Sequence, residues 1–168
     1  MEKLPAGIGL FLALVVLTWA GPAVADCSDP PGPSVDWTRC YFDGGDFRGA
    51  NLEGARLVDA TFSRANLVDA NLSETYARRA KFISAELEGA NFAGARLRGA
   101  DLTRANLTGA SLAGADLRGA RLFRANLQGA DLSGARLGNV DFVDADLSGA
   151  TWIDGERTCG EGSIGQCH

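Results

Sequence analysis

An apolar residue recurs at every fifth position from Phe42 to Trp152, without insertion or deletion. This spacing gives 23 consecutive units, and nearly all of their centres are leucine or phenylalanine. Neither the 3.6-residue period of an α-helix nor the two-residue period of a β-strand fits it. Such uniformity predicts one structural unit that is stacked many times.

The segment Ala105 to Gly109 shows the composition of a unit: alanine stands two places before the central leucine, Asn or Asp lies between them, and glycine often closes the unit. Alanine and leucine alternate with polar residues as in a strand, so we expect them to point inward. The closing glycine tolerates the backbone angles of a corner. A chain that turns every five residues closes on itself after a few sides, and stacked coils can then pair their backbone groups.

These residues resemble the pentapeptide-repeat family, whose motif is A(D/N)LXX, and the resemblance covers residues 40–154. It implies an all-β fold, a right-handed quadrilateral β-helix (a pentapeptide-repeat solenoid) with four units in each coil. Its interior would be a ladder of Leu and Phe over Ala with little space for a ligand. One unit departs from the motif because Ala77 replaces leucine, and there we expect a small cavity or an inward shift.

Residues 1–25 have the pattern of a secretory signal peptide: a short charged start, an apolar run over 8–20, a Gly-Pro break and a final Ala-Val-Ala. An uncleaved anchor is the competing interpretation, but a membrane span usually needs about 20 apolar residues. We therefore expect cleavage before Asp26, no membrane span afterwards, and a periplasmic or secreted protein.

The ends of a stacked coil expose unpaired strand edges, which repeat proteins cover with caps. Residues 26–39 and 155–168 lie outside the repeat and are the expected caps. Each cap region carries two of the four cysteines, and an even number in an exported chain indicates two disulfides. The two ends of such a rod should lie roughly 28 Å apart, whereas bridged Cα atoms lie within about 7 Å. This predicts disulfide-stapled caps, with Cys27 bonded to Cys40 and Cys159 to Cys167.

Residues twenty positions apart should stack on one side of a four-sided coil, so the charge of each side can be counted. The side around centres 57 to 137 carries a net +5, while two other sides each carry −4. This basic face consists of Arg56, Arg78, Arg79, Arg96, Arg98, Arg118 and Arg136 with Asp59 and Asp116.

On the fourth side, outward apolar residues should form a line with an arginine rim. The line is Ile83, Thr103, Phe123 and Val143, and the rim is Arg104, Arg121 and Arg124. We call the line the apolar strip, and an apolar strip with an arginine rim is typical of a protein-contact site.

Catalytic signatures are missing from the sequence. The only histidine is the last residue, His168, and no phosphate loop or nucleophile elbow is present. We therefore expect neither an enzyme nor a cofactor or metal site.

The leading hypothesis is an exported scaffold that binds an unidentified protein or an envelope component, or a second copy in a homodimer. The alternative follows from the resemblance: some family members mimic duplex DNA, bind type II topoisomerases and give quinolone resistance. The basic face and the signal peptide argue against that activity here. Nucleic acid bound by the arginine face ranks last, because we expect no aromatic stacking group among those arginines.

Overall fold

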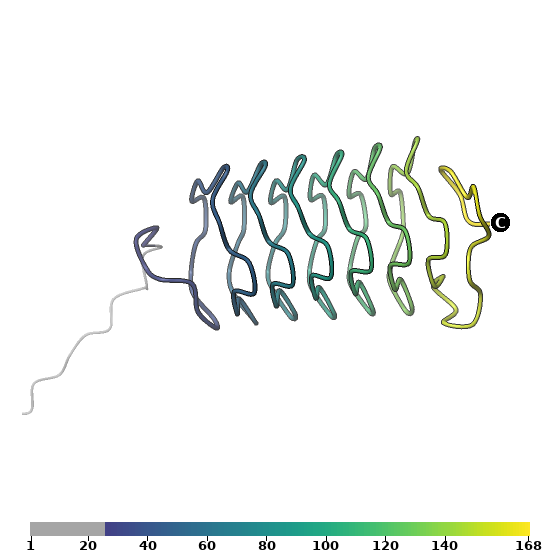
Figure 1. The fold of residues 1–168 in the computed structure, drawn as a ribbon. Coiled ribbons are helices and arrows are strands. Elements are labelled where there is room, and N and C mark those ends of the chain that lie inside the picture. The colour runs from purple at the N-terminus through teal and green to yellow at the C-terminus, as the bar shows by residue number, and fades with distance from the viewer. Residues whose placement is uncertain (1–25) are drawn as a thin grey trace, which may run out of the picture.

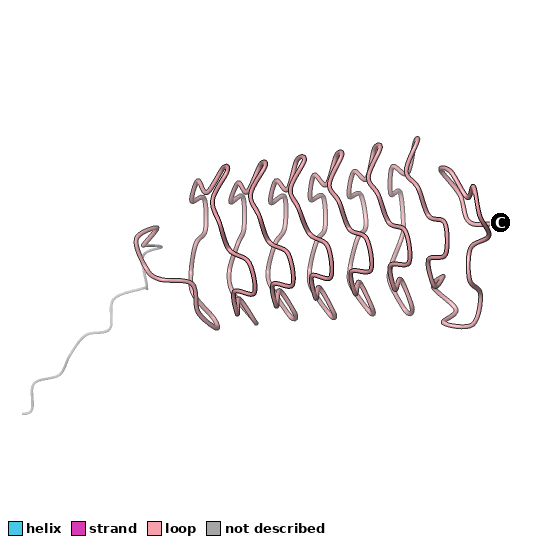
Figure 2. Cartoon of the chain, in the orientation of Figure 1, coloured by secondary structure: helices cyan, strands magenta, loops and turns pink. Residues whose placement is uncertain are grey.

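The computed structural model describes residues 26–168, which form a rod of stacked coils with the C-terminus at one end (Figure 1). The predicted signal peptide, residues 1–25, lies outside the described residues. Within residues 26–168 no continuous helix or strand occurs, and the whole rod is drawn as loop in Figure 2. This part of the chain also has no helix that is long and apolar enough to cross a membrane.

Single parallel bridges between residues twenty apart define the coil, from Asp36 with Arg56 to Asp131 with Thr151. A coil therefore contains four five-residue units, as the family resemblance implies. The expected strands are reduced to one bridging residue per side, because each unit also has to contain a turn. In a typical unit the Arg56 amide donates to the carbonyl of Val35 in the coil before, and the Leu57 amide donates to Tyr76 in the coil after, both at 2.9 Å.

Every corner contains a residue in the left-handed backbone conformation, at each fifth position from Ser34 to Gly149. Glycine adopts this conformation without steric cost, and Gly109 does so with a φ of 64°. The predicted role of the closing glycine is confirmed. Half of these corners nevertheless hold other residues, such as Arg104 with a φ of 58°, so the fold tolerates the strained conformation repeatedly.

The Asn or Asp before each centre stabilises the turn that follows it. In several units its side-chain oxygen accepts a hydrogen bond from the amide two residues later, as Asn91 does from Ala93 at 3.0 Å. This local bond is typical of Asx turns. Asparagines also bond between coils, because the Asn71 side-chain amide donates to Asn51 at 3.1 Å.

The interior is filled by the leucine, phenylalanine and alanine positions. Leu97, Leu117 and their equivalents along the middle of the rod have no exposed surface, and the alanines beside them are at most 1% exposed. Phe62 and Phe82 stack from one coil to the next, with ring centres 5.4 Å apart and planes 8° apart. The core is thus a packed column rather than a channel.

The N-terminal end is closed by aromatic packing and by the Cys27–Cys40 disulfide. Trp37 is 1% exposed, and its ring centre lies 4.3 Å from that of Phe42. Residues 34–39, which we expected to belong to the cap, already follow the repeat geometry, since Ser34 is left-handed and Asp36 bridges to Arg56. Trp37 occupies the centre position of this additional unit.

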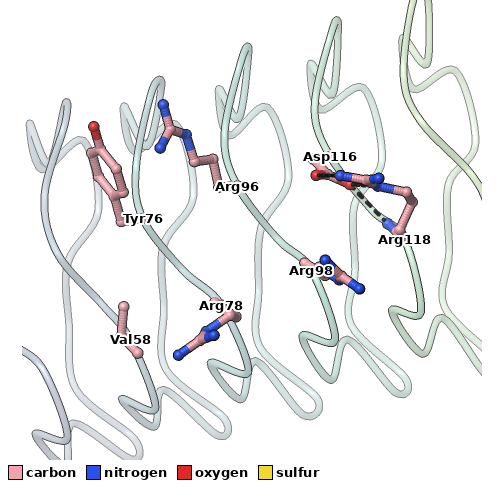
Figure 3. A pocket seen from close by; sticks show the side chains of 7 residues that line it. All are labelled: Val58, Tyr76, Arg78, Arg96, Arg98, Asp116 and Arg118. Atoms are coloured by element: carbon pink, nitrogen blue, oxygen red, sulfur yellow. Dashed lines mark hydrogen bonds and ion pairs between the residues drawn. The ribbon is translucent and has the colours of Figure 1, made fainter.

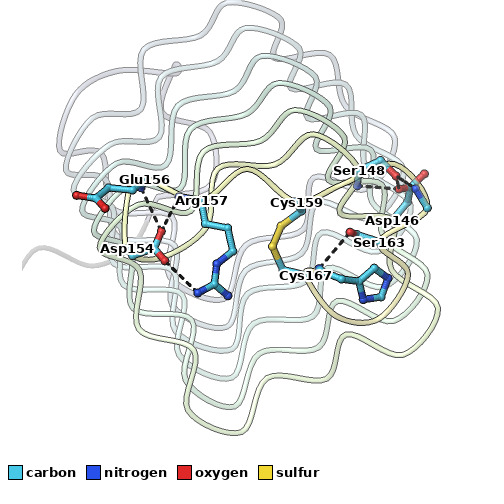
Figure 4. Close-up of a disulfide and its surroundings, with 10 residues drawn as sticks. Asp146, Ser148, Asp154, Glu156, Arg157, Cys159, Ser163 and Cys167 are labelled. Atoms are coloured by element: carbon cyan, nitrogen blue, oxygen red, sulfur yellow. Dashed lines mark hydrogen bonds and ion pairs between the residues drawn. A yellow bond between two sulfur atoms is a disulfide. The ribbon is translucent and has the colours of Figure 1, made fainter.

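At the C-terminal end the pairing changes from parallel to antiparallel. Cys159 exchanges backbone hydrogen bonds with the last coil: Gly149 donates to it at 2.9 Å, and it donates to Ala150 at 2.8 Å. The Cys159–Cys167 disulfide then ties the end of the chain to this segment (Figure 4). Both predicted disulfide pairings are present, and they staple the two ends of the rod.

Candidate binding faces

The packed interior restricts any binding site to the outside of the rod. Among residues 26–168, no group of three or more His, Cys, Asp or Glu side chains is placed to hold a metal ion. All four cysteines are bonded in disulfides, and His168 lies at the end of the C-terminal cap, where its amide donates to the Ser163 hydroxyl oxygen at 3.3 Å.

The basic face is assembled as a contiguous surface. A row of bridges links Arg56 to Tyr76, Arg96, Asp116 and Arg136. Beside it, backbone hydrogen bonds join the coils that carry the row of Arg78, Arg98 and Arg118. Arg79 lies at the adjacent corner. The seven arginines that the sequence assigns to this face thus share one side of the rod.

A groove of about 290 Å³ runs between the two rows of the basic face (Figure 3). A second hollow, of about 440 Å³, lies on the corner side of Arg78, Arg98 and Arg118 and includes Gly99 and Gly119. These three arginines line both hollows. The first groove is lined by Val58, Tyr76, Arg78, Arg96, Arg98, Asp116 and Arg118.

The expectation that no aromatic group lies among these arginines is wrong, because Tyr76 lines the groove. The Arg96 guanidinium lies 4.4 Å from the centre of its ring, and that of Arg56 lies 6.0 Å away on the other side. Such cation–π contacts favour a fixed arginine position. Stacking by twenty residues places Tyr76 between these two arginines, so the spacing could have revealed it.

Ion pairs neutralise part of the basic face. Arg118 donates to both carboxylate oxygens of Asp116, with 2.7 Å from Nε to Oδ1, and this lowers the pKa of Asp116 to about 2. Arg79 pairs in the same way with Asp59 one coil earlier, at 2.7 Å, and lowers the pKa of that carboxyl. Arg56 lies 3.3 Å from Asp36.

Other arginines of this face have no carboxylate partner. In the part of the chain that the structure describes, Arg78, Arg96, Arg98 and Arg136 form no ion pair. The first three line the groove beside Tyr76. The positive charge of the face is consequently concentrated in this groove.

The apolar strip also forms a line along the rod, as backbone hydrogen bonds connect its successive coils. Ile83, Thr103 and Phe123 are partly buried, while Val143 is 57% exposed. Two of the three arginines of the rim form ion pairs, which the sequence analysis did not predict. Arg121 pairs with Asp101 at 3.1 Å, and Arg124 pairs with Asp144 at 3.2 Å. The Arg124 guanidinium also lies 4.8 Å from the centre of the Phe123 ring and covers part of it.

Comparison with known proteins supports the fold. A family model described as pentapeptide repeats matches in eight copies, over residues 34–57, 45–82, 55–99, 85–122 and 120–151. No curated protein matches the sequence.

Several solved structures are similar to this chain. HetL, a pentapeptide repeat protein involved in heterocyst differentiation regulation in the cyanobacterium Nostoc sp., is 29% identical over 76% of this chain and 73% of its own, with a TM-score of 0.37. A trypsin-treated variant of QnrB1, a plasmid-mediated fluoroquinolone resistance protein, is 24% identical over 70% of this chain and 65% of its own, with a TM-score of 0.53. A pentapeptide repeat protein from the Arabidopsis thaliana thylakoid lumen is 23% identical over 77% and 84%, with a TM-score of 0.32.

The family model spans most of the rod, and its matched segments begin at residue 34, where the repeat geometry also begins. The chain belongs to the pentapeptide repeat family.

Proposed function

We propose that this protein is an exported, non-catalytic binding rod that holds a protein or envelope partner against its outer faces. The observation that carries this proposal is the closed interior: the central side chains of the rod are fully buried against one another, so ligands are restricted to the surface. A packed column held by regular backbone pairing also keeps its outward side chains at fixed spacing.

Two disulfides support an oxidising compartment for this rod. They join cysteines within each end of the rod, and such bonds persist mainly in secreted or periplasmic proteins. The signal-peptide pattern of residues 1–25 predicts the same compartment. Cell fractionation with N-terminal sequencing of the mature chain tests this part of the proposal: a chain beginning at Asp26 outside the cytoplasm supports it, and a cytoplasmic chain that retains Met1 contradicts it.

The apolar strip is the surface that we propose for a protein partner, because it joins apolar side chains along several coils to charged ones. Pull-down from an envelope fraction with the unmodified protein and the variant Phe123→Asp tests it. Val68→Asp is the matched control: Val68 is also a partly buried outward apolar residue, but it lies on an acidic face. Selective loss of a captured partner in Phe123→Asp supports the strip, whereas equal capture by both variants discards it.

Topoisomerase binding remains the alternative function. The likeness to QnrB1 shows the fold alone, and the basic face weighs against mimicry of an acidic duplex. A DNA gyrase inhibition assay separates the two proposals: inhibition by the purified protein would favour the alternative, and full gyrase activity at saturating protein would remove it.

A further inference from the structure

The groove of Figure 3 is lined by more arginines than carboxylates. Arg78, Arg96 and Arg98 line it, and none of them forms an ion pair within residues 26–168. Asp116 is the single carboxylate of the lining, and Arg118 occupies both of its oxygens. Because Arg118 and Asp116 neutralise each other, three guanidinium groups without an ion pair remain in the groove.

These groups come from two rows on either side of the groove. Arg78 and Arg98 are equivalent residues of successive coils, so their Cα atoms are separated by about one strand spacing, ~4.8 Å. Arg96 belongs to the other row, where its guanidinium lies 4.4 Å from the centre of the Tyr76 ring and extends away from Arg78 and Arg98 (Figure 3). Guanidinium groups donate pairs of hydrogen bonds in a plane, a geometry that matches the oxygens of phosphate. The side chains of Arg78, Arg96 and Arg98 are exposed, so their guanidinium groups can turn toward a ligand that binds between the two rows.

The surroundings favour a small ligand over a long polymer. On the N-terminal side of the groove, charge of the basic face is paired in Arg79–Asp59 and Arg56–Asp36. At the C-terminal end of the groove Arg118 is paired with Asp116, and beyond it Arg136 is the one arginine of the basic face without an ion pair within residues 26–168. The neighbouring side of the rod, around centres 52 to 152, carries −4 and repels an extended polyanion. The volume of the groove, about 290 Å³, is at the lower end of the range for small-molecule sites.

We infer that Arg78, Arg96 and Arg98 form a binding site for a compact phosphate-bearing ligand. This site lies on a different face from the apolar strip, so its failure would leave the proposed partner binding untouched. The ligand is held by charge-assisted hydrogen bonds from the three guanidinium groups, and Val58 and the Tyr76 ring offer apolar contacts to the part that carries the phosphate.

Pyrophosphate and inorganic phosphate are suitable probes, with binding followed by NMR at the arginine Nε–Hε groups of the disulfide-bonded protein. We expect saturable shifts at Arg78, Arg96 and Arg98, with pyrophosphate bound more tightly. The variant Arg78→Gln/Arg98→Gln should bind pyrophosphate at least about tenfold more weakly, since charged hydrogen bonds are lost. Arg48→Gln is the control, because Arg48 is paired with Asp46 on another side of the rod.

Two results would overturn the site. One is a linear, unsaturable response, or equal pyrophosphate affinity in the double variant and Arg48→Gln. The other is tight binding of a single-stranded oligonucleotide with a steep salt dependence, which would assign the face to a polymer instead. Thermal unfolding of each variant confirms that it is folded, and the single variant Arg98→Gln replaces the double variant if that one unfolds.

Discussion

The amide nitrogen of Thr75 and the carbonyl oxygen of Leu72 lie 3.4 Å apart, the longest of the repeated turn hydrogen bonds in residues 26–168. Where alanine occupies the same position, this distance is 2.8 to 3.1 Å. It rises to 3.3 Å at the two valines, Val35 and Val140. The inward site two places before each centre is therefore sized for alanine, and a β-branched side chain pushes the turn open.

Thr75 is accompanied by a compensating change, because Ala77 stands where leucine is expected and both are fully buried. We expect the two positions to be energetically coupled. Ala77→Leu alone should overpack the site beside Thr75 and destabilise the fold by about 1–3 kcal/mol. Thr75→Ala alone removes buried volume and the hydroxyl bond to Leu72, which is 2.8 Å long.

The double variant Thr75→Ala/Ala77→Leu restores the family motif and should be more stable than either single variant. Chemical unfolding of the four proteins gives the coupling free energy, which we expect to exceed about 0.5 kcal/mol in favour of the double variant. Additive effects would show that the larger side chain of Thr75 does not compensate for Ala77.

The leucine ladder itself should be far more sensitive than the outer surface. Leu117→Ala is expected to destabilise by about 2–5 kcal/mol, because Leu117 is fully buried and the coils above and below restrict collapse into the gap. Asn106→Ser is the comparison: Asn106 points outward and bonds to Glu86 at 3.2 Å and to Thr108. Its replacement should cost less than about 1 kcal/mol. Similar losses at both positions in chemical unfolding would contradict the inward and outward assignment.

The C-terminal disulfide should protect the last coil rather than the middle of the rod. Replacing Cys159 and Cys167 with serine removes a crosslink with a sequence separation of 8 and should cost up to about 3 kcal/mol. The amides of Leu147 and Gly149, which donate to the cap, should then exchange with solvent faster. The Leu97 amide, more than two coils away, serves as the internal reference. Equal acceleration at Leu97 would mean that the rod unfolds as one unit and has no locally stabilised end.

Much of the fold could be predicted from the sequence, because inward leucines and corner glycines follow from the period of five. Stacking by twenty does not follow from that period alone and was implied by the family resemblance. The cysteine pairing followed as well, since a rod keeps its ends apart. The C-terminal cap could not be derived in the same way: residues 155–168 have no period, so their antiparallel pairing with Ala150 and Thr151 depends on tertiary contacts.

The basic face was predictable as a set of residues but not as a site. Sequence spacing places Arg78, Arg98 and Arg118 in one row, yet it does not tell which arginines are paired. Arg118 turns to Asp116 two residues earlier and Arg79 turns to Asp59 in the coil before. These rotamer choices, together with Tyr76, decide where uncompensated charge remains.

The ion pair of Asp116 gives the basic face a pH dependence that can be measured. Arg118 holds the pKa of Asp116 at about 2, below its ordinary value of 3.8. Because the folded value is the lower one, the pair stabilises the fold above pH 3.8, and this contribution is lost as the pH falls through about 2. Asp116→Asn should therefore reduce stability at pH 6, by less than about 1 kcal/mol because Arg118 is exposed. The gap between variant and parent in chemical unfolding should then shrink from pH 5 to pH 2. Glu88→Gln is the control, since Glu88 forms no ion pair within residues 26–168. A gap that stays constant over this range would show that Asp116 and Arg118 are not paired in solution.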